Sequence, residues 1–417
     1  MPIEIGSLAL LLALAISFYS LAGLYLGEKT GNEPLAASAR GGILAIAFLV
    51  TIASLLLFYS LARSDFSVLY VQKYTSAGLP LLYKLTAFWA GNTGSLLLWA
   101  WILSLYSAVV AWRRGPILLW VNIILLVNQA FFLVLLNFVA SPFLRTPGPV
   151  PLEGNGLNPL LQNPGMLLHP LTLYLGYVGF AVPFAFAMAA LILRRADDAW
   201  IRATRRWSVL AWMFLTLGNL YGAQWAYLEL GWGGYWGWDP VENASFIPWL
   251  TATAFIHSVM IQERKDMLKI WNIALITITY LLTLFGTFLV RSGVLTSVHD
   301  FSNTSLGTYF LTFIVVMLVF SLYLILDRRH LLQEGREFEA YLSRESSFLL
   351  NNLLLVGAAF AVFWGTVFPL VSEAVRGIKV TVGPPFFNQV TGPILLAVLF
   401  AMGVCPLIAW QSPPGRS

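Results

Sequence analysis

Charged residues are scarce in this chain of 417 residues. Asp, Glu, Lys and Arg together make up 10% of the sequence, whereas 59% of its residues are hydrophobic. Soluble domains carry roughly 25% charged residues, so this composition excludes an ordinary soluble globule. It also excludes a disordered chain, which combines low hydrophobicity with high net charge.

Cysteine is almost absent. Cys405 is the one thiol, and it falls inside an apolar stretch near the C-terminus. A single cysteine cannot form an intrachain disulfide, a CxxC redox pair or a CxxCH haem-attachment motif. The chain is therefore not itself a c-type cytochrome.

Long stretches without charge are abundant. A membrane-spanning helix needs roughly 20 such residues, and they recur along the whole sequence. They predict an all-α polytopic integral membrane protein, a single membrane domain over 1–417 with about 11 transmembrane helices. The first stretch lacks a small-residue cleavage site, so we interpret it as a helix and not as a signal peptide. The predicted helices cover 5–26, 41–62, 94–112, 116–138, 169–193, 207–227, 246–262, 270–290, 306–326, 348–370 and 393–410.

The distribution of basic residues predicts the orientation. With the N-terminus outside, the inner loops hold 17 of the 24 Lys and Arg residues, and 7 remain outside. The positive-inside rule then places the N-terminus outside and the C-terminus in the cytoplasm, with the protein in the cytoplasmic membrane. The net charge of +5 follows from this topology. No basic groove with interleaved aromatics predicts nucleic-acid binding.

The predicted outer loops differ from the inner ones. Inner connectors are short and charged, whereas outer loops are rich in Gly, Pro, Asn and aromatic residues. We expect such loops to pack together on the outer face or at the membrane interface, where Trp and Tyr are favoured. The predicted outer loops are 63–93, 140–168, 228–245, 291–305 and 371–392.

The loop 228–245, which we call the tryptophan loop, is the most unusual segment. Trp232, Tyr235, Trp236 and Trp238 fall within seven residues and are separated by glycines. Glycine lets backbone approach a flat ligand closely, and each indole offers an apolar face and one N–H donor. The segment therefore suits a large planar ligand with polar edges. The alternative is an interfacial aromatic belt, although a belt does not need interleaved glycines.

The four histidines lie in different places. His169 opens the fifth predicted helix from the outside, and His299 lies in the outer loop 291–305. His257 is eleven residues into the seventh predicted helix, near the bilayer midplane, where an ionisable side chain suggests function. Neutral imidazole is a common haem ligand, but a helix–helix hydrogen bond is the alternative for His257. His330 is on the inner side and is interpreted as a solvated residue.

Four further charged residues flank the outer side. Asp239 and Glu242 follow the tryptophans, and either a cap of the next helix or contact with a ligand would explain them. Arg291 and Arg145 are outer-face cations that could meet haem propionates. For Arg145 we favour an ordinary surface position.

The segment WGGYWGWDPVENA at 232–244 resembles the signature of the WWD-domain haem-handling proteins. Within this CcmF/CycK/CcsA family, the chain most resembles the CcmF cytochrome c haem lyase subunits of maturation system I. Further segments match in the same order: YKLTAFW at 83–89, GSLLLW at 94–99, NPLLQNPG at 158–165, GTFLVRSGV at 286–294 and GPPFFN at 383–388.

The resemblance implies two haem sites. His169 and His299 would flank the tryptophan loop and ligate the substrate haem, while His257 would be an axial ligand of a resident haem b. The family has a second membrane histidine for haem b on a later helix, after a further outer domain. We therefore expect this chain to be the N-terminal part of a longer or split lyase.

The resemblance also implies the activity. The expected function is to join haem to the CXXCH motif of apocytochrome c on the outer, periplasmic side, by adding each cysteine thiol across a haem vinyl group to form two thioethers. Haem b, reduced by quinol, would help to keep the haem iron ferrous. The residues expected to form the lyase site are Trp232, Trp236, Trp238 and Asp239, with Arg291 at the cofactor.

The expected partners are apocytochrome c, a CcmE-like haem chaperone, CcmH-like thiol-handling subunits, quinol and membrane lipid. One alternative is a haem exporter or haem-presenting protein without ligase activity. Another is a secondary transporter in which His257 relays protons, but that class usually shows broken helices and paired repeats.

Overall fold

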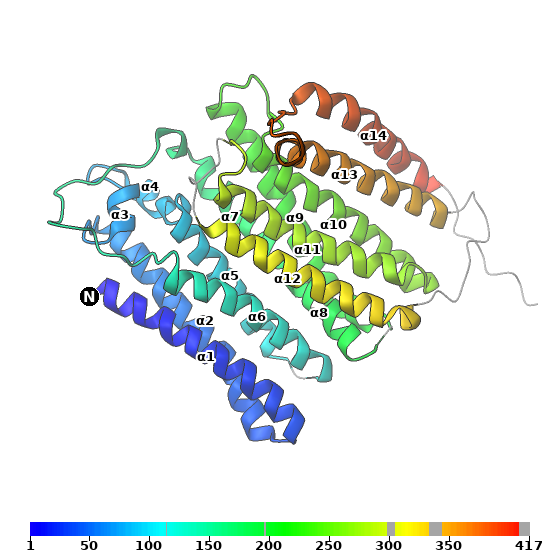
Figure 1. The fold of residues 1–417 in the computed structure, drawn as a ribbon, viewed down its shortest axis with the longest axis horizontal. Coiled ribbons are helices and arrows are strands. Elements are labelled where there is room, and N and C mark those ends of the chain that lie inside the picture. Colours follow the sequence, from blue (N-terminus) through cyan, green and yellow to red (C-terminus); the bar gives the residue numbers. More distant parts are fainter. Residues whose placement is uncertain (114, 196, 298–304, 333–343, 408–417) are drawn as a thin grey trace, which may run out of the picture. The chain divides into compact units, whose positions relative to one another are not determined.

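The computed structural model describes residues 1–113, 115–195, 197–297, 305–332 and 344–407 (Figure 1). Within these ranges the chain is helical and has no β-strand beyond one isolated bridge between Val68 and Arg145. The helices are α1 (Pro2–Thr30), α2 (Glu33–Ala62), α3 (Leu69–Tyr74), α4 (Leu81–Thr86), η1 (Ala87–Trp89), α5 (Asn92–Ala111), α6 (Pro116–Phe138), η2 (Pro159–Leu161), α7 (Gly165–Gly179), α8 (Ala181–Ile192), α9 (Ala199–Glu229), α10 (Pro240–Lys265), α11 (Lys269–Ser292), α12 (Leu306–Asp327), η3 (Arg329–Leu332), α13 (Arg344–Arg376), α14 (Pro384–Val404) and η4 (Cys405–Leu407).

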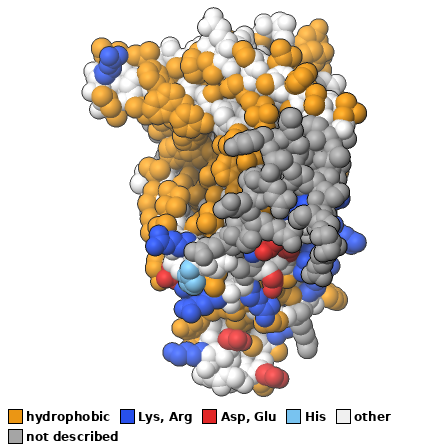
Figure 2. All heavy atoms as spheres, turned by 90° about the vertical axis from the view of Figure 1, so that its right-hand side faces the viewer, with side chains coloured by type: hydrophobic (Ala, Val, Ile, Leu, Met, Phe, Trp, Pro, Cys, Tyr) orange, Lys and Arg blue, Asp and Glu red, His pale blue; other side chains and the backbone are white. Residues whose placement is uncertain are grey.

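Ten spans in the described part of the chain are long and apolar enough to cross a membrane. Their surfaces carry large apolar side chains such as Phe48, Val319 and Phe400, which are 67%, 60% and 73% exposed. Exposed apolar side chains on long helices fit a lipid environment, and hydrophobic side chains cover much of the face in Figure 2. The chain is therefore a multi-pass membrane protein.

Helix α9 forms where the sixth membrane helix is predicted, but it is not among the ten apolar spans. It is 31 residues long. Arg202, Arg205 and Arg206 lie in its first turns, and Asn219 and Gln224 interrupt its apolar part. The helix itself is confirmed, whereas the exact number of crossings and the orientation of the termini stay predictions.

The contacts divide the chain into two compact units. Unit 1 consists of Met1–Ala189 and Phe214–Tyr235, and unit 2 consists of Ala190–Met213 and Trp236–Ser417. The boundaries fall inside α8, inside α9 and inside the tryptophan loop, so each unit contains part of all three. The prediction of a single membrane domain stays a prediction.

In unit 1, α1 and α2 form a helical hairpin with a close interface. The turn uses Gly31 at φ +67, and Asn32 caps α2 by accepting a hydrogen bond from Leu35 N at 3.0 Å. Small residues allow the two backbones to approach, since a Cβ on Gly27 would lie 2.9 Å from the Ala36 nitrogen. Small residues at the interface are typical of helix pairs in membranes.

Two of the predicted outer loops, 63–93 and 140–168, pack on one another. Leu69 N donates to Leu144 O at 2.9 Å, and Ala77 N donates to the Glu153 carboxylate at 2.6 Å. The hydroxyl of Tyr70 donates to backbone carbonyls in η1 at 2.9 Å. The hydrogen bonds from the N–H groups of Ala77 and Gly154 hold the pKa of Glu153 below its ordinary value. The expected packing of these two loops on one another is thus observed, while their place on the outer face stays a prediction.

The fifth predicted helix is one span made of two helices, α7 and α8. Pro183 has no N–H to donate to Gly179 O, so the series of helical backbone hydrogen bonds is interrupted where α7 ends. Helix α7 lies close to the second half of α9, because a Cβ on Gly176 would lie 2.5 Å from Leu215 N and one on Gly218 would lie 2.8 Å from the Leu173 backbone. These glycines bring the two helices together.

In unit 2, α10 packs against α11 and α13, α11 packs against α12, and α13 packs against α14. Buried polar side chains link α10 to α11. Thr279 Oγ1 donates to Thr251 Oγ1 at 2.8 Å, and Asn272 Nδ2 donates to Gln262 Oε1 at 2.7 Å. Gln262 Nε2 in turn donates to Asp198 Oδ1 at 3.0 Å. Burial raises the pKa of Asp198 above its ordinary value.

Two predicted outer loops are shorter than expected. Helix α10 begins at Pro240, not near 246, and α14 begins at Pro384, not near 393. Proline in the first turn of a helix lacks only an N–H that has no intrahelical partner, so it favours such starts. Loop 371–392 is thereby reduced to the connection between Arg376 and Pro384.

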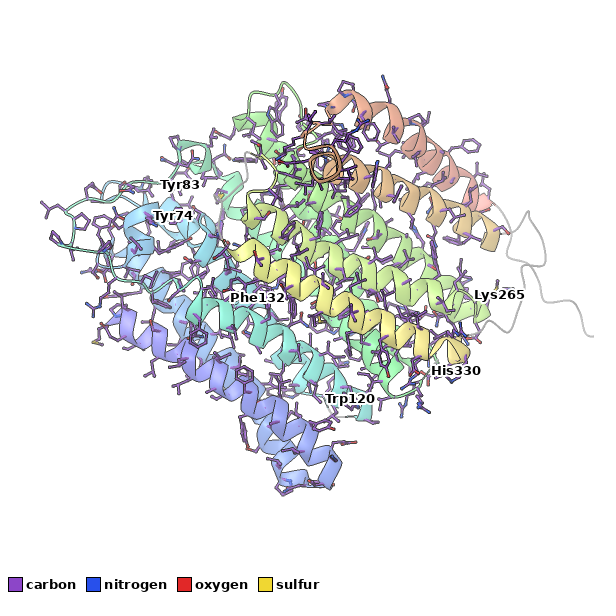
Figure 3. The ribbon with its side chains drawn as sticks, in the orientation of Figure 1. Tyr74, Tyr83, Trp120, Phe132, Lys265 and His330 are labelled. Atoms are coloured by element: carbon purple, nitrogen blue, oxygen red, sulfur yellow. The ribbon has the colours of Figure 1, made fainter. Side chains whose placement is uncertain are left out.

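Basic residues gather at one end of unit 2. Lys265 at the C-terminal end of α10 and His330 in η3, directly after α12, lie at the same end of unit 2 in Figure 3. Figure 2 views that side and shows Lys and Arg side chains together with a histidine. His330 is exposed, as its interpretation as a solvated residue requires.

The α7–α9 interface gives a direct test of this packing. Gly176→Ala places a methyl group against the Leu215 backbone, which cannot withdraw like a flexible side chain. We expect the substitution to destabilise the protein by about 1–3 kcal/mol, as overpacking does. The measurement is the midpoint of thermal unfolding of the purified protein in detergent. Gly357→Ala on α13 is the control, since its Cβ meets open space, and an equal loss there would contradict the assignment.

Candidate functional site

The tryptophan loop runs from Leu230 to Asp239 and belongs partly to each unit. Its first part, in unit 1, turns at Gly231 and Gly233, whose φ angles are +63° and +70°. Trp232 is 37% exposed and Tyr235 is 58% exposed. The Tyr235 ring stacks on Tyr227 of α9, with centroids 4.5 Å apart and planes at 13°. This part presents aromatic surface outward.

Trp238 anchors the second part of the loop, in unit 2. Its ring stacks on Phe387 of α14 at 5.0 Å and 12°, and its indole N–H donates to Asn388 Oδ1 at 2.8 Å. Its backbone has φ +56°, a left-handed conformation that is unusual for a bulky residue. Such strain persists only where surrounding contacts hold it, and it clusters at functional sites.

Trp236 lies beside this anchor. It contacts Trp238 edge to face at 5.9 Å and Phe246 at 5.6 Å. Its indole Nε1 is buried and has no hydrogen-bond partner within the described ranges. Buried indole N–H groups usually find an acceptor. Because the Trp236 indole N–H lies in a predicted ligand-binding loop, a bound ligand could supply the missing acceptor.

Asp239 and Glu242 form a capping box at the start of α10. The Asp239 carboxylate accepts from Val241 N at 3.0 Å, and Glu242 Oε2 accepts from the N–H groups of Gly237 and Asp239 at 3.0 and 3.1 Å. Ser297 Oγ donates to Asp239 Oδ2 at 2.6 Å. Of the two interpretations that the sequence allowed, the structure shows the cap, and these bonds fix the backbone next to Trp238.

His169 lies in the second turn of α7 and faces α9 within unit 1. Its Nδ1 is 2.8 Å from Gly218 O, and its ring is parallel to Trp225, with planes at 9° and centroids 6.4 Å apart. A carbonyl oxygen only accepts, so Nδ1 carries the proton and Nε2 carries the lone pair. This tautomer is the one that metal-ligating histidines adopt when the other ring nitrogen donates to a carbonyl.

The face of α9 that holds His169 is a feature that our sequence analysis missed. Gly218, Gly222 and Trp225 are spaced by four and three residues, so they lie on one side of the helix. A Cβ on Gly222 would be 2.6 Å from His169 Cε1, so only glycine leaves room for the ring. In the sequence, only the spacing of these two glycines and the tryptophan could have indicated this contact face.

His257 lies farther from both ends of its helix than predicted, because α10 extends beyond the predicted range at each end. Because α10 spans Pro240–Lys265, the residue lies about 12 Å from the last residue of the helix at a rise of 1.5 Å per residue. Its depth in the membrane stays a prediction. The ring is half-buried and faces α13, with its centroid 5.9 Å from that of Phe348.

The surroundings of His257 suit a polar prosthetic group. Asn351 Nδ2 is 3.4 Å from His257 Nδ1, and Asn351 Oδ1 is buried with no partner in the described part. Turning that amide would make Oδ1 an acceptor for Nδ1–H and leave Nε2 for a metal. Ser258 Oγ and both amide atoms of Asn352 are likewise buried without partners among the described residues. This fits one axial ligand of a haem.

The remaining predicted site residues have different surroundings. Arg291 is 1% exposed and lies in the last turn of α11, with its guanidinium carbon 6.0 Å from the Phe310 ring centroid. The side chain packs between α11 and α12, while its place on the outer side and its contact with a haem propionate stay predictions. Arg145 forms an exposed ion pair with Glu4, in agreement with an ordinary surface position. His299 lies outside the described residues.

Residues 89–296 match the sequence family Cytochrome C assembly protein. The chain is 45% identical to the cytochrome c-type biogenesis protein CycK of Rhizobium meliloti, over 99% of this chain and 61% of that protein. It is 42% identical to CcmF of Escherichia coli, over 98% of this chain and 64% of that protein. A solved structure of the cytochrome c haem lyase CcmF superposes with a TM-score of 0.82 at 35% identity, over 100% of this chain and 63% of that one. The chain thus spans a little under two thirds of the length of these relatives.

The capping box predicts how Asp239 responds to substitution. Asp239→Asn keeps a side-chain oxygen for Val241 N and Ser297, whereas Asp239→Ala removes it. Loss of such a cap typically costs about 1 kcal/mol, so we expect Asp239→Ala to lower the unfolding midpoint and to speed proteolysis of the loop 230–239. Asp239→Asn should behave nearly as the original protein. Equal damage from both substitutions would show that the negative charge itself is needed.

Proposed function

We propose, from the similarity to cytochrome c assembly proteins, that this chain is the part of a haem lyase that holds haem for covalent attachment to apocytochrome c. The proposed substrate is the CXXCH segment of an apocytochrome together with haem. The likeness to a solved cytochrome c haem lyase supports this function.

The observation that carries the proposal is the orientation of His169. Its Nδ1–H is committed to Gly218 O, its ring is parallel to Trp225, and Gly222 leaves space for it. The imidazole is thereby fixed in the tautomer that offers Nε2 as a ligand. We assign this nitrogen to the iron of the substrate haem, with His299 as the second ligand.

The chemistry requires positioning more than a protein nucleophile. Each substrate thiol adds across a haem vinyl group: a carbon–sulfur bond forms, and the proton goes to the other vinyl carbon. Atoms balance without an oxidant or reductant, and the nucleophiles come from the apocytochrome. Holding the two reactants in the reacting geometry can contribute about 7–11 kcal/mol. His169 and the tryptophan loop are the residues of this chain that supply such positioning.

The tryptophan loop supports binding of a planar ligand with polar edges. Trp236 has an indole N–H without a partner in the described part of the chain, which can donate to a haem propionate. Trp232 and Tyr235 offer exposed aromatic faces. Trp238 and Asp239 act as positioning residues, because the anchor on Phe387 and the capping box hold the loop in place.

A resident haem b is the second part of the proposal. His257 would hold its iron through Nε2, with Asn351 orienting the ring, and the buried amide of Asn352 would face its polar edge. When bound, this group supplies an electron, received from quinol, that keeps the substrate iron ferrous. The described part of the chain places no other histidine at this position, so a second axial ligand would come from elsewhere in the lyase.

The proposed location follows from the distribution of charge. With the basic ends of α10 and α12 in the cytoplasm, the tryptophan loop faces the periplasm of a cytoplasmic membrane. The partners that we propose are apocytochrome c, a haem chaperone resembling CcmE, thiol-handling subunits resembling CcmH, quinol and membrane lipid. A haem exporter or presenting protein is the alternative, since it would share His169 and the loop but not the ligation.

The role of His169 can be tested with three chromosomal substitutions in the native host. His169→Ala removes the ligand, and Gly222→Ala displaces the imidazole without removing it. We expect both to lower the accumulation of holocytochrome c at least ten-fold at normal membrane levels of the protein. Gly41→Ala on α2 is the control, because its Cβ meets nothing within 4 Å. Normal maturation in His169→Ala would refute the assignment, and retained haem without ligation in the original protein would favour the presenting alternative.

The reduced-minus-oxidised visible spectrum of the purified chain tests His257. We expect a b-type absorption that His257→Ala abolishes, because the substitution removes the proposed ligand nitrogen. Asn351→Leu should weaken or shift the absorption, since it removes the amide beside Nδ1. His330 is exposed, and His330→Ala should therefore leave the spectrum unchanged. A spectrum unaffected by His257→Ala would exclude this residue as the ligand.

A further inference from the structure

A cavity of about 450 Å³ lies within unit 2, between the first half of α9, the last part of α10 and the start of α13. Most of its wall is apolar, with Ile201 and Val209 from α9, Phe255 and Met260 from α10 and Phe348 from α13. His257 does not line it. The cavity is therefore separate from the ligand nitrogen proposed for haem b.

One part of the cavity wall is charged. Arg205 of α9 forms an ion pair with Glu263 of α10, and Arg264 also lines the cavity. The Arg205 side chain is 62% exposed, whereas that of Glu263 is only 14% exposed. Arg205 binds one carboxylate oxygen, Oε2. The other oxygen, Glu263 Oε1, is buried and has no hydrogen-bond partner within the described ranges.

A buried carboxylate oxygen without a partner is costly. A ligand that occupied this cavity could satisfy it with a donor, preferably a cationic one. The two arginines beside the Glu263 carboxylate favour an anionic group on the ligand, since guanidinium groups pair well with phosphate. The apolar wall favours a hydrocarbon chain on the same ligand. A single ligand with these three properties has an ammonium group and a phosphate at one end and an acyl chain at the other.

The position along the helices agrees with such a ligand. Glu263 is two residues before the C-terminal Lys265 of α10, and Arg205 is in the second turn of α9. The charged part thus lies at the basic end of unit 2 seen in Figure 3, while Phe255 extends the wall about 12 Å along α10 from Glu263 at 1.5 Å per residue. This is the arrangement of a lipid with its headgroup at the membrane interface.

We propose that this cavity is a binding site for one molecule of phosphatidylethanolamine. Its ammonium group donates to Glu263 Oε1, its phosphate contacts Arg205 and Arg264, and an acyl chain lies along Met260 and Phe348. A phosphatidylglycerol has the phosphate but no ammonium for the carboxylate. A phosphatidylcholine has a quaternary ammonium, which has no N–H to donate. The site therefore distinguishes headgroups that share the same acyl chains.

The test measures lipid retained by the full chain. The protein is purified in detergent, supplied with phosphatidylethanolamine, phosphatidylcholine or phosphatidylglycerol of identical acyl chains, and examined by native mass spectrometry. We expect one tightly bound phosphatidylethanolamine, with at least ten-fold weaker retention of the other two. Equal retention of phosphatidylcholine would overturn the proposal, since it would show an apolar groove without headgroup recognition.

Matched variants locate the site. Glu263→Gln and Arg205→Ala should each lower retention at least ten-fold, whereas Arg206→Ala is the control, because this exposed neighbour does not line the cavity. Met260→Trp should also displace the lipid by filling the apolar part, while leaving the Arg205–Glu263 pair intact, so the proposal does not depend on variants that alter this pair. Unchanged retention in Met260→Trp, or an equal loss in Arg206→Ala, would place the lipid elsewhere. Recovery of another amphiphile that Met260→Trp displaces would overturn the choice of phosphatidylethanolamine.

Discussion

The constraint on which this structure depends is the need to satisfy every backbone N–H and C=O group away from water. In hydrocarbon a helix meets this need within its own segment, so a chain this poor in charge folds as long helices. Irregular backbone is left to the connections, and these must then obtain hydrogen bonds from side chains. In the tryptophan loop Asp239, Glu242 and Asn243 provide them, and Asn243 Nδ2 donates both to Trp238 O at 3.2 Å and to Thr366 Oγ1 at 3.0 Å.

The same constraint explains which parts of the fold were predictable. Uncharged stretches locate helices because the membrane demands them, and each of the eleven predicted positions contains helix in the described ranges. Helix starts were less predictable where an acidic residue caps the helix. Asp239 and Glu242 interrupt an uncharged stretch, so the sequence suggested that α10 begins after them, whereas they form its first turn. His257 therefore lies farther from the start of its helix than expected.

Close contacts between helices were the part of the site that hydropathy could not show. Gly218 and Gly222 look like ordinary helix residues, and their importance appears only when α7 is placed against α9. Packing between helices also explains why the burial of Arg291 was not predicted. A charged residue at the end of an apolar stretch suggests a surface position, but α12 covers it and leaves it 1% exposed. His169 and the tryptophan loop were found because their residue types are unusual, whatever their surroundings.

The backbone and the side chain of Trp238 have opposing requirements. Its backbone conformation favours glycine or asparagine, and a left-handed residue with a large side chain costs about 1–2 kcal/mol. Its ring contacts require a large aromatic side chain with an N–H donor for Asn388. Glycine would relieve the backbone and lose the stack, while phenylalanine would keep a ring and lose the donor. Position 238 therefore keeps its aromatic contacts at the expense of an unfavourable backbone conformation. A substitution that changes the ring at this position thus also alters the surroundings of Phe387 and Asn388, two contacts on another helix.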